Sequence, residues 1–537
     1  MSFEELFSQH PISQSIISNI NSINDIKNLT LSSPDIVNHL SNITIKKTFN
    51  MPSNTLIIRH EKCNNEDFTG QWEKIYIVYN NVKYKINNFY EQLTKHMDGF
   101  LEYIHTIRVE LNDSYQTYIF PKLQYFFTSF GSFIDGLFDL LPNAIELNLY
   151  CRFNMHLILI KNLTSSKIKV ISGIDLDYFS DNIQGEDFYL GDFFNGLSEL
   201  NEIHIYFKQV GRYLYPPYIN IIYDIIRYLS TKEGNKLVIN ADNDIYTMYF
   251  YEEILCKFSS FDINLSLDSY YSEERIFRSD LSNCDMQRNV MLHHVVEFKY
   301  NIKCRERAEC LFISLLNLTN LKILRIEVNE RFVLNELKIG IDFNEKLFEN
   351  ISNVEELYLT ISNMKYIYNE DDTNQNFDDS MLYKNEFILK ILKNLKDKLK
   401  ILYLSGVPNL TKEMSEIIKV NCPRITDLYI EPFLSVDVDF LKEMKKLKFV
   451  YLKNVEKLII PRNVQMVIFE SEETPESRMI AKMNDNQSYE YFKEKFNRKF
   501  KISIRSCEEG YHKHNVFFDN IFHGNMYLKK VYLYKKK

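Results

Sequence analysis

One group of side chains near the C-terminal end of the chain resembles a metal site. Its members are Cys507, His512, His514 and His523. Thiolates and imidazoles are ligands that zinc prefers, but the spacing Cys-x4-His-x-His-x8-His matches no standard zinc pattern. The adjacent residues His293 and His294 would point to opposite faces of a strand and could not share a metal ion. We therefore predict a polar C-terminal segment and no bound metal.

Nucleotide-dependent chemistry is not indicated either. Phosphate-binding loops and dinucleotide folds need clustered glycines, and the chain has only 14 glycines among 537 residues. Neither G-x-G-x-x-G nor G-x-x-x-x-G-K-[ST] occurs in the sequence. We find no motif that joins a nucleophile to a base, although distant residues can also assemble such a site. The sequence therefore predicts a protein that is not an enzyme and needs no cofactor.

The composition is typical of an ordered protein. The chain carries 64 Lys+Arg against 72 Asp+Glu, a formal net charge of −8, and 45% of its residues are hydrophobic. Basic residues gather at Lys529, Lys530 and 535–537, which we interpret as a solvated tail. Nucleic-acid binding needs clustered positive charge, so we expect no nucleic-acid partner.

Cysteine use and hydropathy bear on the cellular compartment. The eight cysteines are scattered and none forms Cys-x-x-Cys, which favours a reducing environment over a disulfide framework. The first residues include acids where a secretory signal needs a basic start, and no run of about 18 apolar residues occurs. We expect a cytoplasmic and/or nuclear protein that does not enter a membrane.

A short apolar phrase of the form L-x-x-L-x-L recurs along the chain, and it is typical of the strand in a leucine-rich repeat. Its clearest copies are Leu321/Leu324/Ile326, Val354/Leu357/Leu359, Leu399/Leu402/Leu404, Ile425/Leu428/Ile430 and Leu447/Val450/Leu452. Weaker copies are Ile104/Ile107/Val109, Ala144/Leu147/Leu149, Leu200/Ile203/Ile205, Val295/Phe298/Tyr300, Val455/Leu458/Ile460 and Val464/Val467/Phe469, with partial matches at Ile168/Val170, Leu237/Ile239 and Leu265/Leu267.

Segments of helical period lie between several of these phrases, as a strand-plus-helix repeat requires. Examples are 221–229, 387–395 and 414–418, each with one apolar stripe. The polar, acidic segment 369–380 is predicted to be a mobile loop. The sequence predicts an α/β fold: a leucine-rich-repeat solenoid with a curved parallel sheet and helices on its convex side.

In each repeat strand, the residue between the last two apolar positions should point away from the core, because side chains alternate along a strand. In four successive phrases this residue is a tyrosine: Tyr358, Tyr403, Tyr429 and Tyr451. We predict that the rings form a row that binds a target protein, since tyrosine is common at binding hot spots. Neighbouring charges on the same surface are Arg325, Glu327 and Glu431. Alternatively, the aromatic rings are there because aromatic residues favour strands.

The first 45 residues form a separate unit without strand signals. Apolar residues recur mostly at three- and four-residue steps, so we predict a small helical module, with Pro11 suited to the start of one helix. The pattern resembles the F-box, a three-helix module that binds the Skp adaptor of cullin-based ubiquitin ligases. Here His10-Pro11 stands for the Leu-Pro pair of the family, and the usual basic and aromatic residues are replaced at 34–36.

The resemblance implies that the apolar helix faces of the module bind the Skp adaptor and, through it, a cullin. The residues it points to are Pro11, Ile12, Ile16, Ile17, Ile20, Asp25, Ile26, Leu29 and Leu31. The chain then resembles the F-box/leucine-rich-repeat substrate receptors of SCF-type ubiquitin ligases. Two alternatives stay open: the module is a plain helical cap, and the protein is an interaction scaffold that does not bind the adaptor.

We divide the chain accordingly into four parts. They are an F-box-like module (1–45), a linking or capping segment with a β-hairpin around Asn80-Asn81 (46–100), an irregular solenoid (101–470), and a C-terminal cap with a basic tail (471–537).

Overall fold

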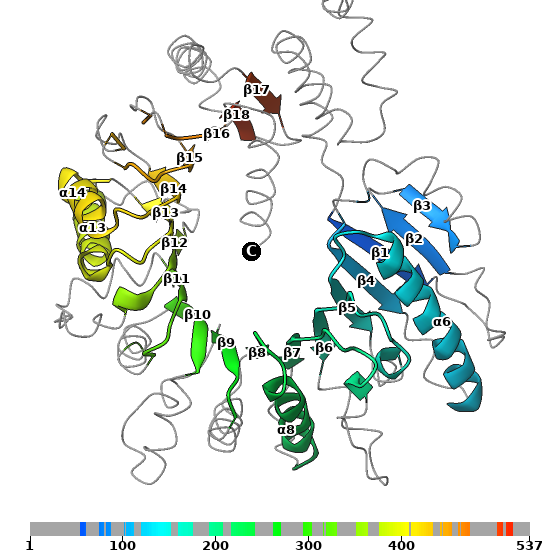
Figure 1. Cartoon of the computed structure of the whole chain (residues 1–537). Coiled ribbons are helices and arrows are strands. Elements are labelled where there is room, and N and C mark those ends of the chain that lie inside the picture. The colour runs from blue at the N-terminus through cyan, green and yellow to red at the C-terminus, as the bar shows by residue number, and fades with distance from the viewer. Residues whose placement is uncertain are drawn as a thin grey trace, which may run out of the picture. The chain divides into compact units, whose positions relative to one another are not determined.

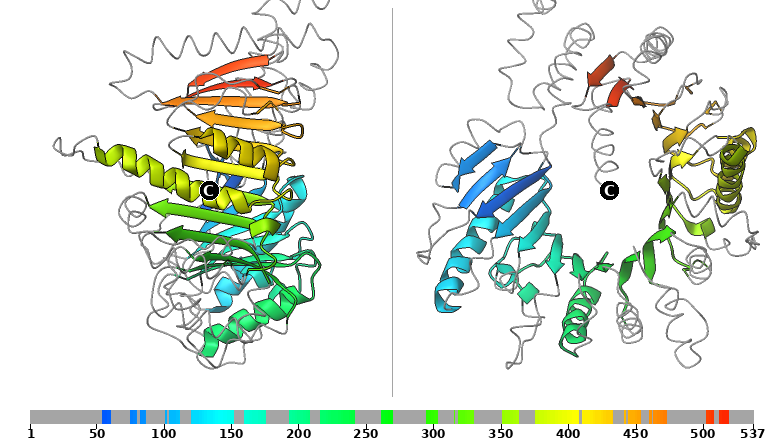
Figure 2. Two further views of the ribbon diagram at one scale, coloured as in Figure 1. Left: turned by 90° about the vertical axis from the view of Figure 1, so that its left-hand side faces the viewer. Right: turned by 180° about the vertical axis from the view of Figure 1, so that it is seen from behind.

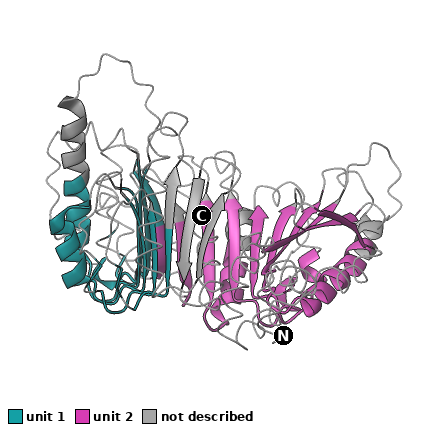
Figure 3. Ribbon diagram, turned by 90° about the horizontal axis from the view of Figure 1, so that it is seen from above, with its two compact units in different colours: residues 1–20, 24–51, 299–537 teal, residues 21–23, 52–298 magenta. Residues whose placement is uncertain are grey.

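A computed structural model of the chain describes somewhat less than half of its residues. They are 54–60, 75–79, 82–86, 101, 104–111, 120–151, 159–175, 193–207, 216–241, 261–269, 294–302, 315, 318–329, 351–362, 375–407, 410–432, 441–442, 444–453, 460–461, 463–472, 502–507 and 512–518. They fall into two compact units, unit 2 with residues 52–298 and unit 1 with residues 299–537 (Figure 3). The division falls within β10 (Val295–Ile302).

Unit 2 contains a mostly parallel sheet with the strand order β3-β2-β1-β4-β5-β6-β7-β8-β9. The antiparallel pairings are those of β2 with β1 and with β3, so β2 alone runs opposite to the other strands. The strands are β1 (Thr55–His60), β2 (Ile75–Tyr79), β3 (Val82–Lys85), β4 (Thr106–Leu111), β5 (Glu146–Cys151), β6 (Val170–Asp175), β7 (Glu202–Phe207), β8 (Lys236–Ala241) and β9 (Asn264–Ser269), with helices α6 (Phe120–Leu140) and α8 (Pro216–Ser230).

Unit 1 contains a second sheet with the order β11-β12-β13-β14-β15-β16-β18-β17, parallel up to β16 and antiparallel beyond it. The left view of Figure 2 shows these strands one above another. The strands are β11 (Ile323–Asn329), β12 (Glu356–Ser362), β13 (Ile401–Val407), β14 (Asp427–Pro432), β15 (Phe449–Lys453), β16 (Met466–Glu472), β17 (Ile502–Cys507) and β18 (His512–Phe518), with helices α13 (Gln375–Asn394) and α14 (Lys412–Asn421).

The repeated apolar phrase sets the register of both sheets. In unit 1, one row of directly opposite residues is Leu324, Leu357, Leu402, Leu428, Val450 and Val467. In unit 2, the corresponding row is Ile107, Leu147, Ile171, Ile203, Leu237 and Leu265. All twelve side chains are buried. The prediction that these phrases lie side by side as parallel strands is therefore confirmed.

The helices supply the other half of each core. Helix α6 buries an aromatic stripe that includes Phe127 and Phe130, and α8 buries Ile222 and Ile226. In unit 1, α14 begins after Thr411, whose hydroxyl accepts a hydrogen bond from the backbone N–H of Met414. Figure 1 shows that the helices of each unit lie on one side of its strands. We call the opposite sheet surface the open face of that unit.

Asp135 fastens α6 to the loop that follows β5. Its carboxylate accepts hydrogen bonds from the backbone N–H and the hydroxyl of Thr164, both at 2.8 Å, and from the N–H of Ser165 at 3.0 Å. Nearby, the ammonium group of Lys167 donates to the carbonyls of Phe138 and Asp139 at the C-terminal end of α6, where the helix dipole favours a cation. These contacts fix the helix against the sheet.

Several sequence-based details need correction. The phrase at Ile168/Val170 is out of phase: Ile171 takes the central position, and a bulge at Gly173, which has φ +81°, places Ile174 in the core. The segment 369–380 is not wholly a loop, because α13 begins at Gln375. Strand β15 pairs directly with β16, so the phrase at Val455/Leu458/Ile460 adds no strand between them.

The predicted hairpin is confirmed, with β2 and β3 antiparallel and Tyr79 directly opposite Val82. It is, however, part of the sheet of unit 2, because β2 pairs with β1, a strand that we did not predict. The predicted F-box-like module lies outside the described residues, as do its candidate adaptor-binding residues.

Candidate functional site

The tyrosine row, Tyr358, Tyr403, Tyr429 and Tyr451, lies on the open face of unit 1. Tyr358 is directly opposite Tyr403, which is opposite Tyr429, which is opposite Tyr451. The four residues come from consecutive parallel strands, β12 to β15, so the register of the leucines that they adjoin also aligns the rings. The predicted row is therefore present.

The rings stack against one another. The ring centroids of Tyr403 and Tyr429 are 4.0 Å apart and those of Tyr429 and Tyr451 are 4.3 Å apart, each pair with an interplanar angle of 16°. Tyr358 joins the stack less regularly, 5.8 Å from Tyr403 and tilted by 36°. Because the flat faces contact each other, the row presents ring edges to a ligand. Such a row suits contact with a protein surface better than intercalation of planar groups.

The row is accessible over only part of its length. Tyr358, Tyr403 and Tyr429 are half-buried, whereas Tyr451 is only 2% exposed. Phe449 and Ile468, which share the face of Tyr451, are also buried. Tyr451 therefore supports the stack from below the surface instead of contacting a target, which removes it from the predicted target-binding residues.

Charged groups surround the accessible part. The guanidinium of Arg325, on β11, lies over the Tyr358 ring, 3.9 Å from its centroid. It covers the end of the stack on the side of β11. The Tyr358 hydroxyl donates to the carboxylate of Glu356 at 2.8 Å, and the Ser405 hydroxyl donates to that of Glu431. Glu327 is half-buried on the same face. Sequence reasoning missed Glu356 and Ser405, although strict alternation from each tyrosine would have found both.

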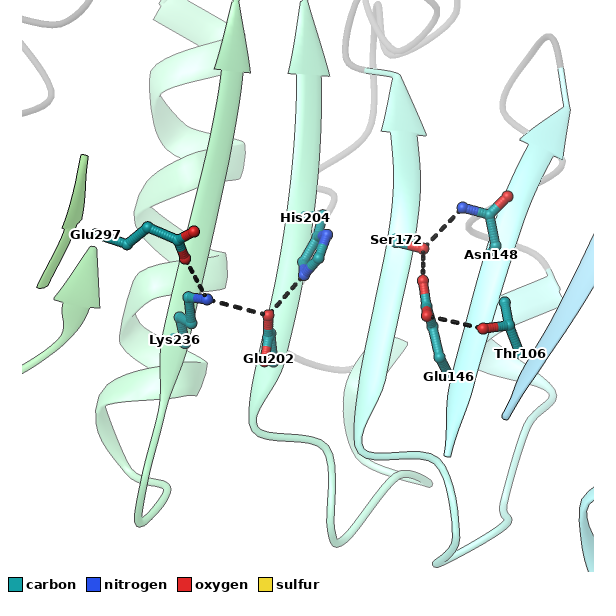
Figure 4. Close-up of polar contacts among 8 residues, drawn as sticks. All are labelled: Thr106, Glu146, Asn148, Ser172, Glu202, His204, Lys236 and Glu297. Carbon is teal, nitrogen blue, oxygen red and sulfur yellow. Dashed lines mark hydrogen bonds and ion pairs between the residues drawn. The ribbon is translucent and has the colours of Figure 1, made fainter. Parts of the chain in front are cut away.

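A different polar cluster occupies the open face of unit 2 (Figure 4). The Lys236 ammonium lies 2.9 Å from the Glu297 carboxylate and 3.6 Å from that of Glu202, and Glu202 also contacts the His204 ring at 2.7 Å. Sequence reasoning missed this network because its members lie on strands far apart along the chain. On neighbouring strands, Glu146 accepts hydrogen bonds from Thr106 (2.9 Å) and Ser172 (2.5 Å).

The pKa shifts of Glu202 and Lys236 both favour the charged form of the side chain. Burial alone would raise the pKa of Glu202, but the hydrogen bond from His204 and the charge of Lys236 outweigh it and lower that pKa. Burial would likewise lower the pKa of Lys236, but Glu297 and Glu202 outweigh it and raise that pKa. The carboxylates and the ammonium group thus stabilise one another near neutral pH.

We predict that Lys236→Met lowers the free energy of unfolding by about 1–3 kcal/mol at neutral pH, because two half-buried carboxylates lose their cation. A carboxylate with a lowered pKa contributes stability above its unfolded value of 4.5, and this contribution is lost as pH falls through the folded value. A lysine with a raised pKa contributes below 10.5 and loses that contribution as pH rises further.

The measurement is urea unfolding of both proteins at several pH values. The difference between them should shrink as pH falls below 4.5 and through the lowered pKa of Glu202, where this carboxylate takes up a proton. Lys169→Met, at an exposed lysine of the same unit, is the control and should change little at any pH. A difference that stays constant down to acidic pH would show that the network does not stabilise the fold.

The described residues offer little nucleophilic or metal chemistry. The Ser172 hydroxyl donates to Glu146, while the His204 ring contacts Glu202. Burial raises the pKa of the Cys422 thiol to about 12, against the opposing charge of Lys396, so it is not a thiolate at neutral pH. Within the parts of the chain that the structure describes, no group of three or more His, Cys, Asp or Glu side chains could hold a metal ion. The side chains of Cys507, His512 and His514 lie outside this description, as does residue 523.

Among the described helices, none is both long and apolar enough to cross a bilayer.

Parallel strands aligned by a recurrent apolar phrase, with helices on one side and a polar and aromatic face on the other, define a protein of the leucine-rich-repeat type. Residues 47–529 match a protein family described as a domain of unknown function, DUF8346. The chain belongs to this family. No curated protein matches the chain.

Two solved structures show limited similarity. An internalin (inlF) from Listeria monocytogenes str. 4b F2365 is 13% identical with a TM-score of 0.27, over 61% of this chain and 78% of that chain. A TLR13–ssRNA13 complex is 12% identical with a TM-score of 0.29, over 70% of this chain and 55% of that chain.

Proposed function

We propose that this chain is a non-catalytic receptor that binds a target protein through the open face of unit 1. The observation that carries the proposal is the tyrosine row, whose half-buried rings lie on a rigid sheet and are held in place by stacking. Tyrosine contributes a large contact area at a low cost in conformational entropy, and stacking lowers that cost further. Arg325, Glu327 and Glu431 supply charge selectivity around the rings.

The finer form of the proposal is that the protein is the substrate-recognition subunit of an SCF-type ubiquitin ligase. Its support is the resemblance of residues 1–45 to an F-box, followed by a repeat array. The Skp adaptor would bind the apolar helix faces and connect the chain to a cullin. The receptor would then contribute proximity, which raises the effective concentration of the target lysine near the transferring enzyme. The alternative is an interaction scaffold that does not bind the adaptor.

The target-binding prediction is tested at the two best-stacked accessible rings. We expect the double variant Tyr403→Ala/Tyr429→Ala to bind its target at least about tenfold more weakly, because each ring is a candidate hot spot. The measurement is quantitative co-precipitation from cell extract followed by affinity measurement with the identified target. Tyr403→Phe/Tyr429→Phe is the matched control, since it keeps the stack and removes only the hydroxyls. Unchanged affinity in the alanine variant would refute a role of the row in binding.

The adaptor prediction is tested separately with purified Skp adaptor. The full chain should bind the adaptor, and a chain that lacks residues 1–45 should not, while both retain target binding. If the full chain fails to bind the adaptor under conditions in which an established F-box protein binds it, the ligase role is wrong. The alternative, an interaction scaffold that does not bind the adaptor, then replaces it.

A further inference from the structure

A second surface with a different character lies on the open face of unit 2, at the end of the sheet that carries the hairpin. We call it the basic patch. Its members are Arg59, Tyr76, Lys83, Lys85, Arg108, Glu110 and Tyr150. Four of these side chains are cations and one is a carboxylate. Arg59, Lys83, Lys85 and Tyr150 are exposed, and the exposed fraction of Tyr150 is 61%.

The register places these residues in two adjacent rows across the sheet. The first row runs Lys85, Tyr76, Arg59, Glu110 and Tyr150, each directly opposite the next. The second row runs Lys83, Val78, Ile57 and Arg108. Directly opposite residues share a face of the sheet, so the patch has cations on both sides of a small apolar pair, Val78 and Ile57.

Contacts among the described residues orient the side chains of the patch. One carboxylate, Glu110, pairs with both Arg59 at 2.7 Å and Arg108 at 3.0 Å. The Lys83 ammonium lies 3.6 Å from the centroid of the Tyr76 ring, and the Arg108 guanidinium lies 4.6 Å from that of Tyr150. Among the described side chains of the patch, cations therefore outnumber carboxylates by four to one. This contrasts with the network around Lys236, where two carboxylates surround one lysine.

The dimensions of the patch indicate the form of its ligand. Lys85 and Arg59 are two strand spacings apart, about 10 Å. A peptide in the extended polyproline II conformation has three residues per turn and advances about 9 Å in three residues, so carboxylates at positions i and i+3 lie on one side of it and would reach both cations. An apolar side chain between them would lie near Val78 and Ile57. Exposed tyrosine and arginine are also the residue types that most often anchor protein interfaces.

Nucleic acid fits this surface less well. A phosphodiester backbone needs several clustered cations, and the patch offers four with a carboxylate, Glu110, between its two arginines. The chain as a whole has a net charge of −8, which opposes approach of a polyanion over a larger area.

From the charge, register and exposure of these residues, we propose that the basic patch binds an extended acidic segment of a partner protein, with carboxylates three residues apart and apolar residues between them. This surface is distinct from the tyrosine row and lies in the other unit, so the inference holds or fails independently of the proposed function.

The test is fluorescence anisotropy with the full chain and a labelled peptide of about twelve residues that repeats Glu-Leu-Ser. The peptide should bind, and a matched peptide with Gln in place of Glu should bind at least about tenfold more weakly. Binding should also weaken strongly between about 50 mM and 500 mM NaCl, since salt screens exposed charges.

Variants locate the binding on the patch. Arg59→Glu and Lys85→Glu should each weaken binding of the Glu peptide about tenfold by reversing one charge. Arg424→Glu is the matched control, because Arg424 has nearly the same side-chain exposure (56% against 53%) and also one acidic partner. Lys85 is exposed on the short strand β3, so Lys85→Glu retains the fold, which thermal unfolding verifies.

Three outcomes would overturn the proposal. The first is equal binding of the Glu and Gln peptides. The second is binding of the Glu peptide that neither Arg59→Glu nor Lys85→Glu changes. The third is tighter binding of a labelled single-stranded DNA that also depends on Arg59, which would make the patch a nucleic-acid site.

Discussion

Replacing Gly173 with alanine is expected to lower the free energy of unfolding by about 2–4 kcal/mol. Two effects combine at this position. Gly173 has φ +81°, which residues with a side chain rarely adopt, at a cost of about 1–2 kcal/mol. A Cβ atom there would also lie 2.3 Å from the carbonyl oxygen of Leu149, a backbone atom of the neighbouring strand that has little freedom to move. The measurement is the midpoint of urea unfolding.

Gly234 in the same unit provides a control that separates these effects. Its φ is +65°, but nothing lies within 4 Å of a Cβ atom built on it. Gly234→Ala should therefore cost only about 1 kcal/mol. If both variants lose the same stability, the close approach of β6 to β5 at Gly173 is not the cause, and the bulge is less constrained than its geometry indicates.

The second large effect is expected at the centre of the leucine row of unit 1. Leu402→Ala should lower the free energy of unfolding by about 3–5 kcal/mol, from lost burial and from the cavity that remains. Leu402 has no exposed surface, and it lies opposite Leu357 on one side and Leu428 on the other. Because parallel strands on both sides hold their registers, the site has little room to collapse.

Val420→Ala is the matched control for the loss of apolar atoms in unit 1. Val420 is 73% exposed on α14, so its replacement should leave the unfolding midpoint nearly unchanged. Circular dichroism during urea unfolding measures both variants. A small effect of Leu402→Ala would mean that the row does not form the core that holds the strands in register.

The parts of the fold that follow from local spacing could be predicted from the sequence. The phrase Leu399/Leu402/Leu404 predicts both the buried side of β13 and the position of Tyr403 on the opposite side, because side chains alternate along a strand. The row of tyrosines then follows from the register of the leucines. The limit of this reasoning is Tyr451, since alternation gives the face of a residue but not what covers that face.

Other features depend on contacts between distant residues and could not be predicted. Lys236 forms ion pairs with Glu202 and Glu297, which are 34 and 61 positions away in the sequence. No local sequence motif indicates such contacts. Strand β1 was missed because its parallel partner, β4, follows some fifty residues later. The basic patch was missed for the same reason: its charges are sparse along the chain and become neighbours only across the sheet.

The stacked rings of Tyr403, Tyr429 and Tyr451 also have an optical consequence. At 4.0 and 4.3 Å, their electronic transitions couple strongly, which should produce a distinct near-ultraviolet dichroic band. The chain contains one tryptophan, Trp72, and 36 tyrosines, so the band is read as the difference between the chain and its Tyr403→Ala/Tyr429→Ala variant. A molecule bound against the ring edges would perturb the band, which would give the proposed receptor an intrinsic spectroscopic reporter of occupancy that needs no label.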